Sequence, residues 1–212
     1  MRLSKKGYCV YRLDSRNGKC QKFWCNRLSL KAQYKAKLGD SIAINGTCLS
    51  VVSIESDGFS VELSPETLSH VATEKFTGYV HIEPAMMMGD RFEGHIVQGH
   101  IDTIGTVASI TDSGNSFDVI INVDPKFITF IPPKGSISID GVSLTVNEVM
   151  KESFRLTIIP ITMRETLFGT YKKGTRVNIE TDVFARYMHH IMNTSKQTSL
   201  SWNDVERISS LY

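Results

Sequence analysis

The chain has 212 residues, of which 41% are hydrophobic and 22% are charged, and its net charge at pH 7 is +2. This is the composition of an ordinary globular protein with one or two domains, and no apolar run approaches the roughly 18 residues of a membrane-spanning helix. The basic start has no apolar stretch behind it, which argues against a secretory signal, so we expect a cytoplasmic protein with no membrane partner.

The positive charge is concentrated near the start of the chain. Residues 1–37 hold eleven Lys or Arg and one acidic residue, Asp14, with several aromatic residues among them. This pattern occurs in nucleic-acid-binding segments, and it also fits a solvated face of a sheet. We favour the second interpretation and expect no nucleic-acid partner. The four cysteines form no Cys-x-x-Cys pair, so we expect reduced thiols and no metal site.

Two stretches of the chain repeat each other. Residues 41–67 read SIAINGTCLSVVSIESDGFSVELSPET, and residues 136–162 read SISIDGVSLTVNEVMKESFRLTIIPIT. They share Ser, Ile, Gly, Leu, Val, Phe, Pro and Thr at matching places with an offset of 95 residues. A fixed offset indicates one structural unit used twice. We therefore expect two related domains, with either two similar pockets or one pocket shared by unlike halves.

Strand signals follow this repeat in chain order. Apolar and polar residues alternate in short runs, and the pairs Asn45-Gly46, Asp57-Gly58 and Asp140-Gly141 predict tight hairpin turns between them. Short strands at this spacing are typical of a small antiparallel barrel or sandwich. Strands are expected at residues 7–13, 21–33, 41–44, 48–52, 59–63 and 79–83 in the first copy, and at residues 136–139, 142–149, 154–159 and 176–180 in the second.

The segments outside these strands have looser patterns. Residues 67–73 and 162–168 predict short helices, and residues 84–93 predict a linker between the two copies. Three consecutive methionines in that linker, residues 86–88, are expected to fill gaps in a core, because Met is flexible and apolar.

The tail has a helical period. An apolar stripe recurs there at a spacing of three and four residues. Its members are Phe184, Tyr187, Met188 and Ile191, followed by Val205, Ile208 and Tyr212 after a possible capping residue, Ser201. A stripe outside complete barrels needs a partner surface, which is either the chain's own barrels or another subunit. We favour the other subunit.

The second copy opens with Gly94-His-Ile-Val-Gln-Gly-His-Ile-Asp102. We expect a strand here, so that His95 and His100 fall on opposite faces and cannot share a metal ion. The glycines indicate a close approach of the backbone to a ligand or to another strand. One of the two histidines should face inward, either as a satisfied structural residue or as part of a site.

Small polar residues recur at equivalent places in the two hairpins. Cys48 corresponds to Ser143, and Ser50 corresponds to Thr145. Thiol and hydroxyl groups repeated on one face can line a polar pocket, although Ser and Thr are also ordinary strand residues.

Three segments together resemble the riboflavin synthase family: residues 39–51 (GDSIAINGTCLSV), 94–102 (GHIVQGHID) and 134–146 (KGSISIDGVSLTV). The resemblance covers residues 27 to 188. It implies an all-β fold of two tandem six-stranded antiparallel Greek-key barrels, at residues 1–88 and 89–182, with residues 1–25 atypical. A C-terminal helical segment, residues 183–212, would join three subunits into a homotrimer.

The resemblance also implies an activity. Riboflavin synthases carry out a dismutation in which two molecules of 6,7-dimethyl-8-ribityllumazine exchange a four-carbon fragment, giving riboflavin and 5-amino-6-ribitylaminouracil. The family needs no cofactor, and its site lies between the first barrel of one subunit and the second barrel of its neighbour. An association with lumazine synthase is a further possible partnership.

The matching positions give candidate roles. The resemblance makes His100 the leading candidate for proton transfer or for orienting an anion, and it places Cys48 and Ser143 at the rings, as nucleophiles or as ligands of a nucleophilic water. The remaining positions would bind the substrate's ring and its hydroxyl-rich tail. These are Ser41, Ser50, Thr67, Gly94, Gly99, Lys134, Ser136, Thr145, Thr162 and Asp182.

The start of the chain departs from the family. Its members begin with Met-Phe-x-Gly, whereas this chain begins Met-Arg-Leu-Ser-Lys-Lys-Gly-Tyr-Cys. Either the first pocket is altered, or residues 1 to about 25 come from a shifted reading frame or a different start. The alternative function is a non-catalytic lumazine- or flavin-binding protein of the same family, although the polar residues kept in both copies favour an enzyme.

Overall fold

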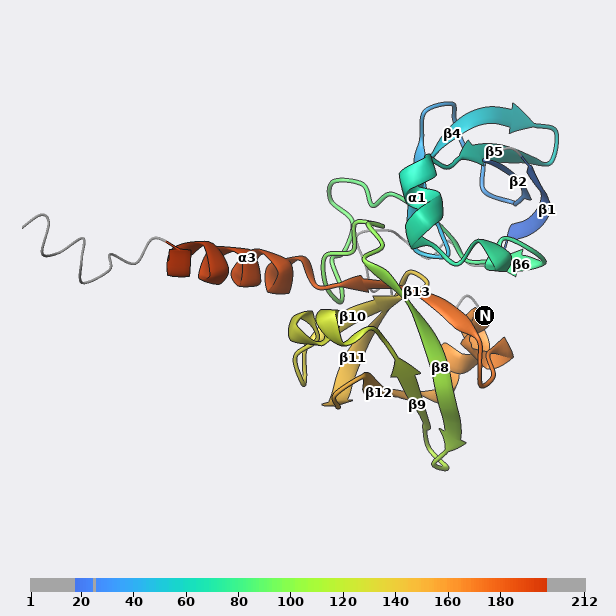
Figure 1. The fold of residues 1–212 in the computed structure, drawn as a ribbon. Helices are drawn as coiled ribbons and strands as arrows, with labels where there is room; N and C mark the ends of the chain where they lie inside the picture. Colours follow the sequence, from blue (N-terminus) through green and yellow to red (C-terminus); the bar gives the residue numbers. More distant parts are fainter. Residues whose placement is uncertain (1–17, 25, 198–212) are drawn as a thin grey trace, which may run out of the picture.

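The computed structural model describes residues 18–24 and 26–197, and it contains two small β-barrels and a helix that extends away from them (Figure 1). The strands of the first barrel are β1 (Gly18–Trp24), β2 (Arg27–Lys31), β3 (Ser41–Ile44), β4 (Thr47–Glu55), β5 (Gly58–Glu62), β6 (Tyr79–Val80) and β7 (Ile82–Pro84). Those of the second are β8 (Thr103–Asp112), β9 (Phe117–Asn122), β10 (Ser136–Ile139), β11 (Val142–Val149), β12 (Ser153–Ile158) and β13 (Arg176–Thr181).

The two barrels have the same strand order. The second is closed in the order β10-β11-β12-β9-β8-β13, and the first runs β7-β3-β4-β5-β2-β1-β6. Because β6 and β7 are separated only by His81, they act as one strand that pairs with β1 at one end and β3 at the other. The jump from β2 to β3 past two other strands is a Greek-key connection. The predicted all-β fold of two antiparallel barrels is therefore confirmed.

Local chemistry explains the repeated hairpins. Asn45 and Gly46 both have positive φ, at 46° and 77°, and Asp140 and Gly141 repeat this at 48° and 88°. Two-residue turns of this kind match the twist of the strands they join. They fix the register of each hairpin, so that Ala43 pairs with Cys48 and Ser138 pairs with Ser143.

Each barrel has its own core, formed by the inward-facing residues of its strands. Phe59 belongs to the first core and Phe154 to the second, and both are fully buried. The predicted short helices are present as α1 (Pro65–His70) with η1 (Thr73–Lys75), and as α2 (Pro160–Glu165) with η3 (Leu167–Thr170). One further short helix, η2 (Pro125–Phe130), follows β9.

The barrels meet through a pair of equivalent buried contacts. His81 shares a hydrogen bond of 3.0 Å between Nδ1 and the Asp140 carbonyl, and its Nε2 accepts the Leu167 N–H at 2.9 Å. Asn178 makes the matching pair, because its side chain donates to the Asn45 carbonyl at 2.9 Å and accepts the Ala72 N–H at 2.8 Å. We call these four hydrogen bonds the barrel clasp.

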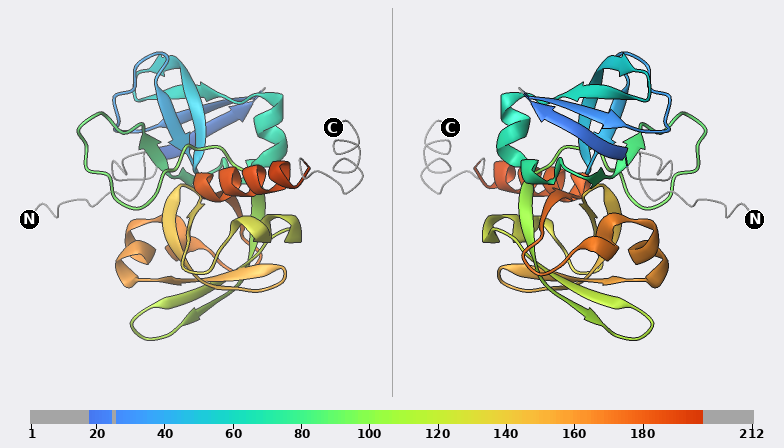
Figure 2. Two further views of the ribbon diagram at one scale, coloured as in Figure 1. Left: turned by 90° about the vertical axis from the view of Figure 1, so that its left-hand side faces the viewer. Right: turned by 90° about the vertical axis from the view of Figure 1, so that its right-hand side faces the viewer.

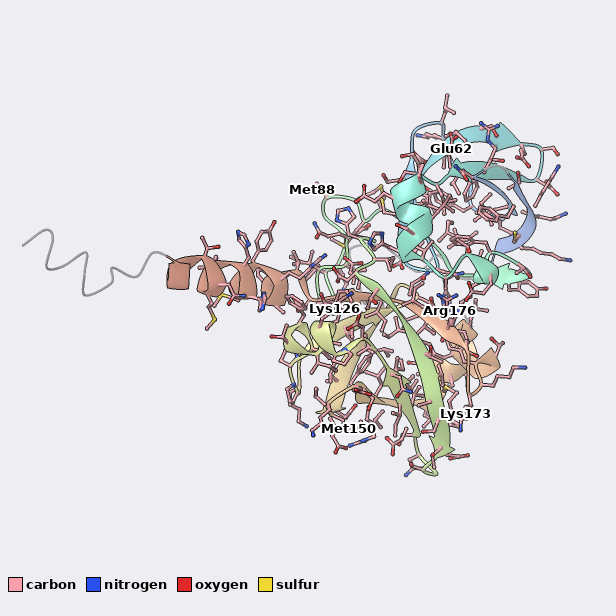
Figure 3. All side chains as sticks on the ribbon, viewed as in Figure 1. Glu62, Met88, Lys126, Met150, Lys173 and Arg176 are labelled. Carbon is pink, nitrogen blue, oxygen red and sulfur yellow. The ribbon has the colours of Figure 1, made fainter. Side chains whose placement is uncertain are left out.

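Two further features close the junction. The carboxylate of Asp140 is fully buried and is held by Lys75 and by the hydroxyl of Tyr171. The two hairpin turns also touch back to back, since a Cβ at Gly46 would lie 2.4 Å from the nitrogen of Gly141. At the edge of the junction Arg176, labelled in Figure 3, pairs with Glu74 of the first barrel at 2.9 Å.

The C-terminal helix, α3 (Val183–Gln197), begins directly after β13 and extends away from both barrels at the level of their junction (Figures 1 and 2). Its apolar stripe is not covered by the chain's own barrels, because Phe184, Tyr187, Met188, Ile191 and Met192 are between 56% and 63% exposed. The second predicted stripe, from Ser201 onward, and the strand predicted at residues 7–13 lie outside the described residues. Within residues 18–24 and 26–197 no helix is long and apolar enough to span a membrane.

Three sequence-based expectations are wrong. The stretch 21–33, expected as a strand, is divided between β1 and β2, which pair with each other. Residues 94–102 do not form a strand, because their backbone makes only isolated hydrogen bonds, to the Glu180 carboxylate, to Cys48 of β4 and to Ile179 of β13, rather than a continuous ladder. Met87 and Met88 of the linker do not fill a core: Met87 is 66% exposed, and Met88 is fully exposed and points outward in Figure 3, whereas Met86 is half-buried.

Candidate functional site

The two barrels carry matching rows of residues on their outer faces. In the first barrel Glu83, Ala43 and Cys48 are direct neighbours across β7, β3 and β4. In the second barrel Glu180, Ser138 and Ser143 are direct neighbours across β13, β10 and β11. Paired residues on adjacent strands have Cβ atoms roughly 5 Å apart. We call these the first row and the second row.

The substrate-binding residues predicted on the hairpins extend these rows. Ser41 pairs with Ser50 two residues along from the first row, and Ser136 pairs with Thr145 two residues along from the second. Residues two apart on a strand share a face. The structure therefore brings six of the predicted residues together as two equivalent polar faces. They are Cys48, Ser41 and Ser50 on one barrel, and Ser143, Ser136 and Thr145 on the other.

A loop crosses from one row to the other. We call residues 94–102 the bridging loop. At one end His95 lies against the second row, with Nδ1 2.7 Å from the Ser143 Oγ. Further along, the carbonyl of Gly99 accepts the N–H of Cys48 in the first row at 3.0 Å. Gly99 has φ of 77°, and a Cβ there would lie 2.6 Å from Cys48, so only glycine fits this approach.

His95, and not His100, is the inward-facing histidine. His95 is 7% exposed, and burial lowers the pKa of its imidazole while the nearby Asp182 carboxylate partly opposes this. A neutral imidazole 2.7 Å from a serine hydroxyl is a nucleophile–base arrangement. His95 Nε2 and Ser138 Oγ are buried without a hydrogen-bond partner among the described residues. His100 is exposed.

The other predicted residues lie at element ends. Asp182 accepts the N–H of Phe184 at 2.8 Å at the start of α3. Thr67 lies in the first turn of α1 and shares a hydrogen bond of 2.9 Å with Ser64, the residue that caps this helix. Gly94 and Lys134 are exposed with positive φ, and the N–H of Lys134 donates to the Val146 carbonyl. The structure gives none of these a contact with the rows.

Thr162 lies in α2, the helix that follows β12. Its carbonyl accepts two hydrogen bonds from Thr166, from the N–H at 3.1 Å and from the hydroxyl at 2.7 Å. Its side chain is half-buried.

Glu180 is a buried carboxylate that the sequence analysis did not select. It is 0% exposed, and it accepts the backbone N–H groups of Gln98 and Gly99, each at 2.8 Å. Burial raises the pKa of Glu180 to about 7, while these N–H groups and the nearby Arg186 act in the opposite direction. Its position in the row is equivalent to that of Glu83, which is the signal that could have found it.

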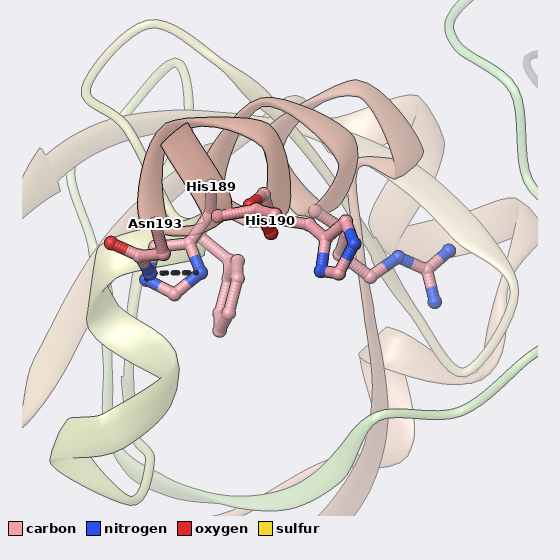
Figure 4. A pocket seen from close by; sticks show the side chains of 6 residues that line it. His189, His190 and Asn193 are labelled. Atoms are coloured by element: carbon pink, nitrogen blue, oxygen red, sulfur yellow. Dashed lines mark hydrogen bonds between the residues drawn. The ribbon is translucent and has the colours of Figure 1, made fainter. Parts of the chain in front are cut away.

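A shallow pocket of about 430 Å³ lies elsewhere, between η2 and α3 (Figure 4). It is lined by Phe130, Arg186, His189, His190, Asn193 and Thr194. None of the predicted site residues lines it. Among the described residues, no group of three or more His, Cys, Asp or Glu is placed to hold a metal ion.

Comparison with known proteins agrees with the repeated architecture. The lumazine binding domain matches residues 8–85 and again residues 98–182. The chain is 41% identical to riboflavin synthase from Photobacterium phosphoreum over 189 residues, which cover 86% of this chain and 85% of the relative. It is 45% identical to riboflavin synthase from Actinobacillus pleuropneumoniae, over 73% of each chain. The chain belongs to the riboflavin synthase family.

The riboflavin synthase family is a family of enzymes, the transferases expected from the resemblance. Riboflavin synthase from Bacillus subtilis is more distant, with 35% identity over 76% of this chain and 75% of the relative. Among solved structures, LumP complexed with 6,7-dimethyl-8-(1'-D-ribityl) lumazine has a TM-score of 0.70 at 21% identity, covering 81% of this chain and 98% of LumP. LumP with riboflavin gives 0.69 at 21% identity. At this identity the likeness shows the fold alone.

Proposed function

We propose that this chain is a riboflavin synthase. It takes two molecules of 6,7-dimethyl-8-ribityllumazine and moves a four-carbon fragment from one to the other. The donor leaves as 5-amino-6-ribitylaminouracil, and the acceptor becomes riboflavin. Donor and acceptor are the same compound, so the reaction calls for two similar binding faces rather than one.

One observation carries this proposal: the two outer rows are equivalent, and each presents polar groups at both ends, although Ala43 stands in the first row where the second has Ser138. The first row presents the thiol of Cys48, and the second presents the hydroxyl of Ser143 at the same register position. Each row is continued by a pair of hydroxyl residues, Ser41 with Ser50 and Ser136 with Thr145. Such groups can satisfy a ribityl chain that leaves water on binding. The identity to named riboflavin synthases supports the same assignment.

The chemistry needs a base and a nucleophile. A methyl proton must leave one ring, and a nucleophile must add to the other. We assign the base at the second row to His95, because its imidazole is buried and lies 2.7 Å from the Ser143 hydroxyl. Ser143 then adds to the ring or holds the water that does, and Cys48 is its counterpart in the first row. His100 stays a candidate for proton transfer from the exposed side of the bridging loop.

Positioning supplies much of the rate in this proposal. Two rings held face to face react as if at a very high local concentration. We propose that the first-barrel face of one subunit meets the second-barrel face of its neighbour in a homotrimer, as the exposed stripe of α3 would allow. A place in the cytoplasm and an association with lumazine synthase belong to the same proposal. Thr67, Lys134, Thr162, Gly94 and Asp182 would contact substrate at the margins of these faces.

The test is direct. Purified protein is mixed with 6,7-dimethyl-8-ribityllumazine, and riboflavin formation is followed by its absorbance. Riboflavin and the diaminopyrimidine appearing in equal amounts, with two lumazines consumed for each, supports a synthase. Tight binding of the lumazine with no product at any protein concentration would instead make the chain a binding protein of this family. Ser143→Ala serves as the control that should lose turnover while it keeps the fold.

A further inference from the structure

We propose that Glu180 is a positioning residue that holds the bridging loop against both rows through the loop's own backbone N–H groups. The inference rests on the proposed function only for its effect on turnover. The contact itself is a property of the fold. Glu180 touches neither reacting ring in this proposal, and it acts by placing residues that do.

The first step concerns the hydrogen bonds of the Glu180 carboxylate, both of whose oxygens have a donor. Its two oxygens each accept one backbone N–H at 2.8 Å, from Gln98 and from Gly99, and the next N–H along the loop, that of His100, also lowers the pKa of the carboxylate. A buried carboxylate without such donors would be costly. Three consecutive N–H groups directed at one carboxylate form a backbone cradle, so the loop and the side chain determine each other's position.

The second step is that the contact is reciprocal. Asp102, at the end of the loop, accepts both the N–H and the hydroxyl of Thr181 at 2.7 Å. Thr181 follows Glu180 in β13. The loop and the strand therefore each supply one carboxylate that accepts hydrogen bonds from the other. Arg186 of α3 lies over both, 3.1 Å from Asp102 and 3.7 Å from Glu180. The loop is therefore tied to β13 and to the helix that extends from it.

The third step is what the held segment reaches. Four residues before Gly99, His95 lies at the Ser143 hydroxyl, and the carbonyl of Gly99 itself bonds to Cys48. Glu180 lies in the second row, separated from Ser143 only by Ser138. A loop released from this carboxylate would lose its alignment with Cys48 and with Ser143 together. Only a glycine fits at position 99, which leaves little slack for another arrangement.

The charge around Glu180 gives the expected pH behaviour. The groups that face Glu180 are Arg186, which attracts the carboxylate, and the three N–H groups. The nearby Asp102 carboxylate is itself paired with Thr181 and Arg186. Protonation of Glu180 leaves its carboxyl group with fewer sites that can accept hydrogen bonds from the N–H groups of the cradle. Because the pKa of Glu180 is raised to about 7, the loop should be held more firmly above neutral pH than below it.

The variant Glu180→Gln tests this, because the amide keeps the shape but turns an N–H donor toward the cradle. Hydrogen–deuterium exchange of the segment 98–100 should become at least about tenfold faster, and kcat should fall about tenfold with a change in KM of less than about threefold. Glu148→Gln is the matched control, since Glu148 is an exposed carboxylate of the same barrel paired with Arg155. It should change neither quantity.

The outcomes separate the two proposals. Unchanged exchange at residues 98–100 in Glu180→Gln, or faster exchange with unchanged kcat, would overturn the positioning role. Wild-type protein that makes no riboflavin would reject the synthase assignment, and the exchange measurement would still decide whether the carboxylate holds the loop. If Glu180→Gln does not fold, Glu180→Asp keeps the charge on a shorter side chain, and smaller changes in the same two quantities are expected. Their absence there would also count against the proposal.

Discussion

His81 and Asn178 occupy equivalent positions in the two barrels, and each makes the same pair of hydrogen bonds with the other barrel. Each donates to the carbonyl of the first residue of the opposing hairpin turn, Asp140 or Asn45. Each also accepts an N–H that follows the opposing α-helix, from Leu167 or from Ala72. An imidazole and an amide thus serve as alternatives, because each offers one donor and one acceptor.

The barrel clasp predicts which substitutions at position 81 are tolerated. His81→Leu leaves the Leu167 N–H and the Asp140 carbonyl buried without partners, which should cost about 3 kcal/mol of unfolding free energy. His81→Asn keeps one donor and one acceptor, as Asn178 does in the other barrel, and should cost only about 1 kcal/mol. Urea unfolding followed by circular dichroism measures both. Equal losses in the two variants would show that the hydrogen bonds of the clasp do not matter.

The same residue predicts a pH dependence of stability. Burial lowers the pKa of His81 to about 4, against 6.5 for an ordinary histidine. A lowered histidine pKa means that the unfolded chain takes up the proton first, so stability is full above pH 6.5 and is lost as pH falls toward 4. The loss at pH 4 should be about 3 kcal/mol.

Glu180 acts in the opposite direction over part of this range. Its pKa is raised to about 7, so the folded state gains stability as pH falls from 7 toward the ordinary value of 4.5. The contribution of His81 is therefore read from the difference between wild-type protein and His81→Asn, in which the Glu180 contribution cancels. A difference that stays constant between pH 7 and pH 4.5 would refute the assignment to His81.

The pairing of His95 with Ser143 predicts non-additive losses of activity. His95→Ala and Ser143→Ala should each lower kcat by about 100-fold, because either change removes the nucleophile–base pair. The double variant should be hardly slower than either single variant, since the two groups act as a unit. Steady-state rates of riboflavin formation give the comparison. Losses that multiply in the double variant would mean that the two residues act separately.

The exposed stripe of α3 predicts self-association. Met188→Glu places a charge in the middle of the stripe and should shift the protein toward monomers, as seen by light scattering at micromolar concentration. Asn193→Glu adds the same charge on the opposite face of the helix and should leave the assembly unchanged. A trimer that persists in Met188→Glu would show that this stripe is not the association surface.

Alternation and turn chemistry predicted most of the fold. The hairpins around Asn45 and Asp140 were readable because their turn residues require positive φ and their strands alternate without interruption. No strand was assigned to β8 or β9, which lie outside the two repeated stretches, residues 41–67 and 136–162, that guided the assignment. Residues 94–102 were wrongly expected to form a strand. Glu180 and Cys48, which bond to their backbone, are distant in the sequence and could not be identified as partners from it.

The candidate site was predictable only where the two copies align without gaps. Cys48 and Ser143 were found because the offset of 95 residues holds throughout both hairpins. In the last strand of each barrel the offset becomes 97, so that Glu83 corresponds to Glu180 and His81 to Asn178. This shift hid both the loop-holding carboxylate and the clasp. His95 was one of two named histidines, and only the folded loop distinguishes it from His100.

The contact between Gly46 and Gly141 has an evolutionary consequence. After a duplication, each half of a gene is usually free to drift, but here a methyl group added at Gly46 would lie 2.4 Å from the backbone of the other half, and one added at Gly141 would lie 3.1 Å from it, tighter than an ordinary contact. A change at Gly46 would therefore force the two hairpin turns apart. The two copies of the ancestral unit can therefore diverge at their surfaces. At this point of contact, however, a mutation in one copy also affects the other.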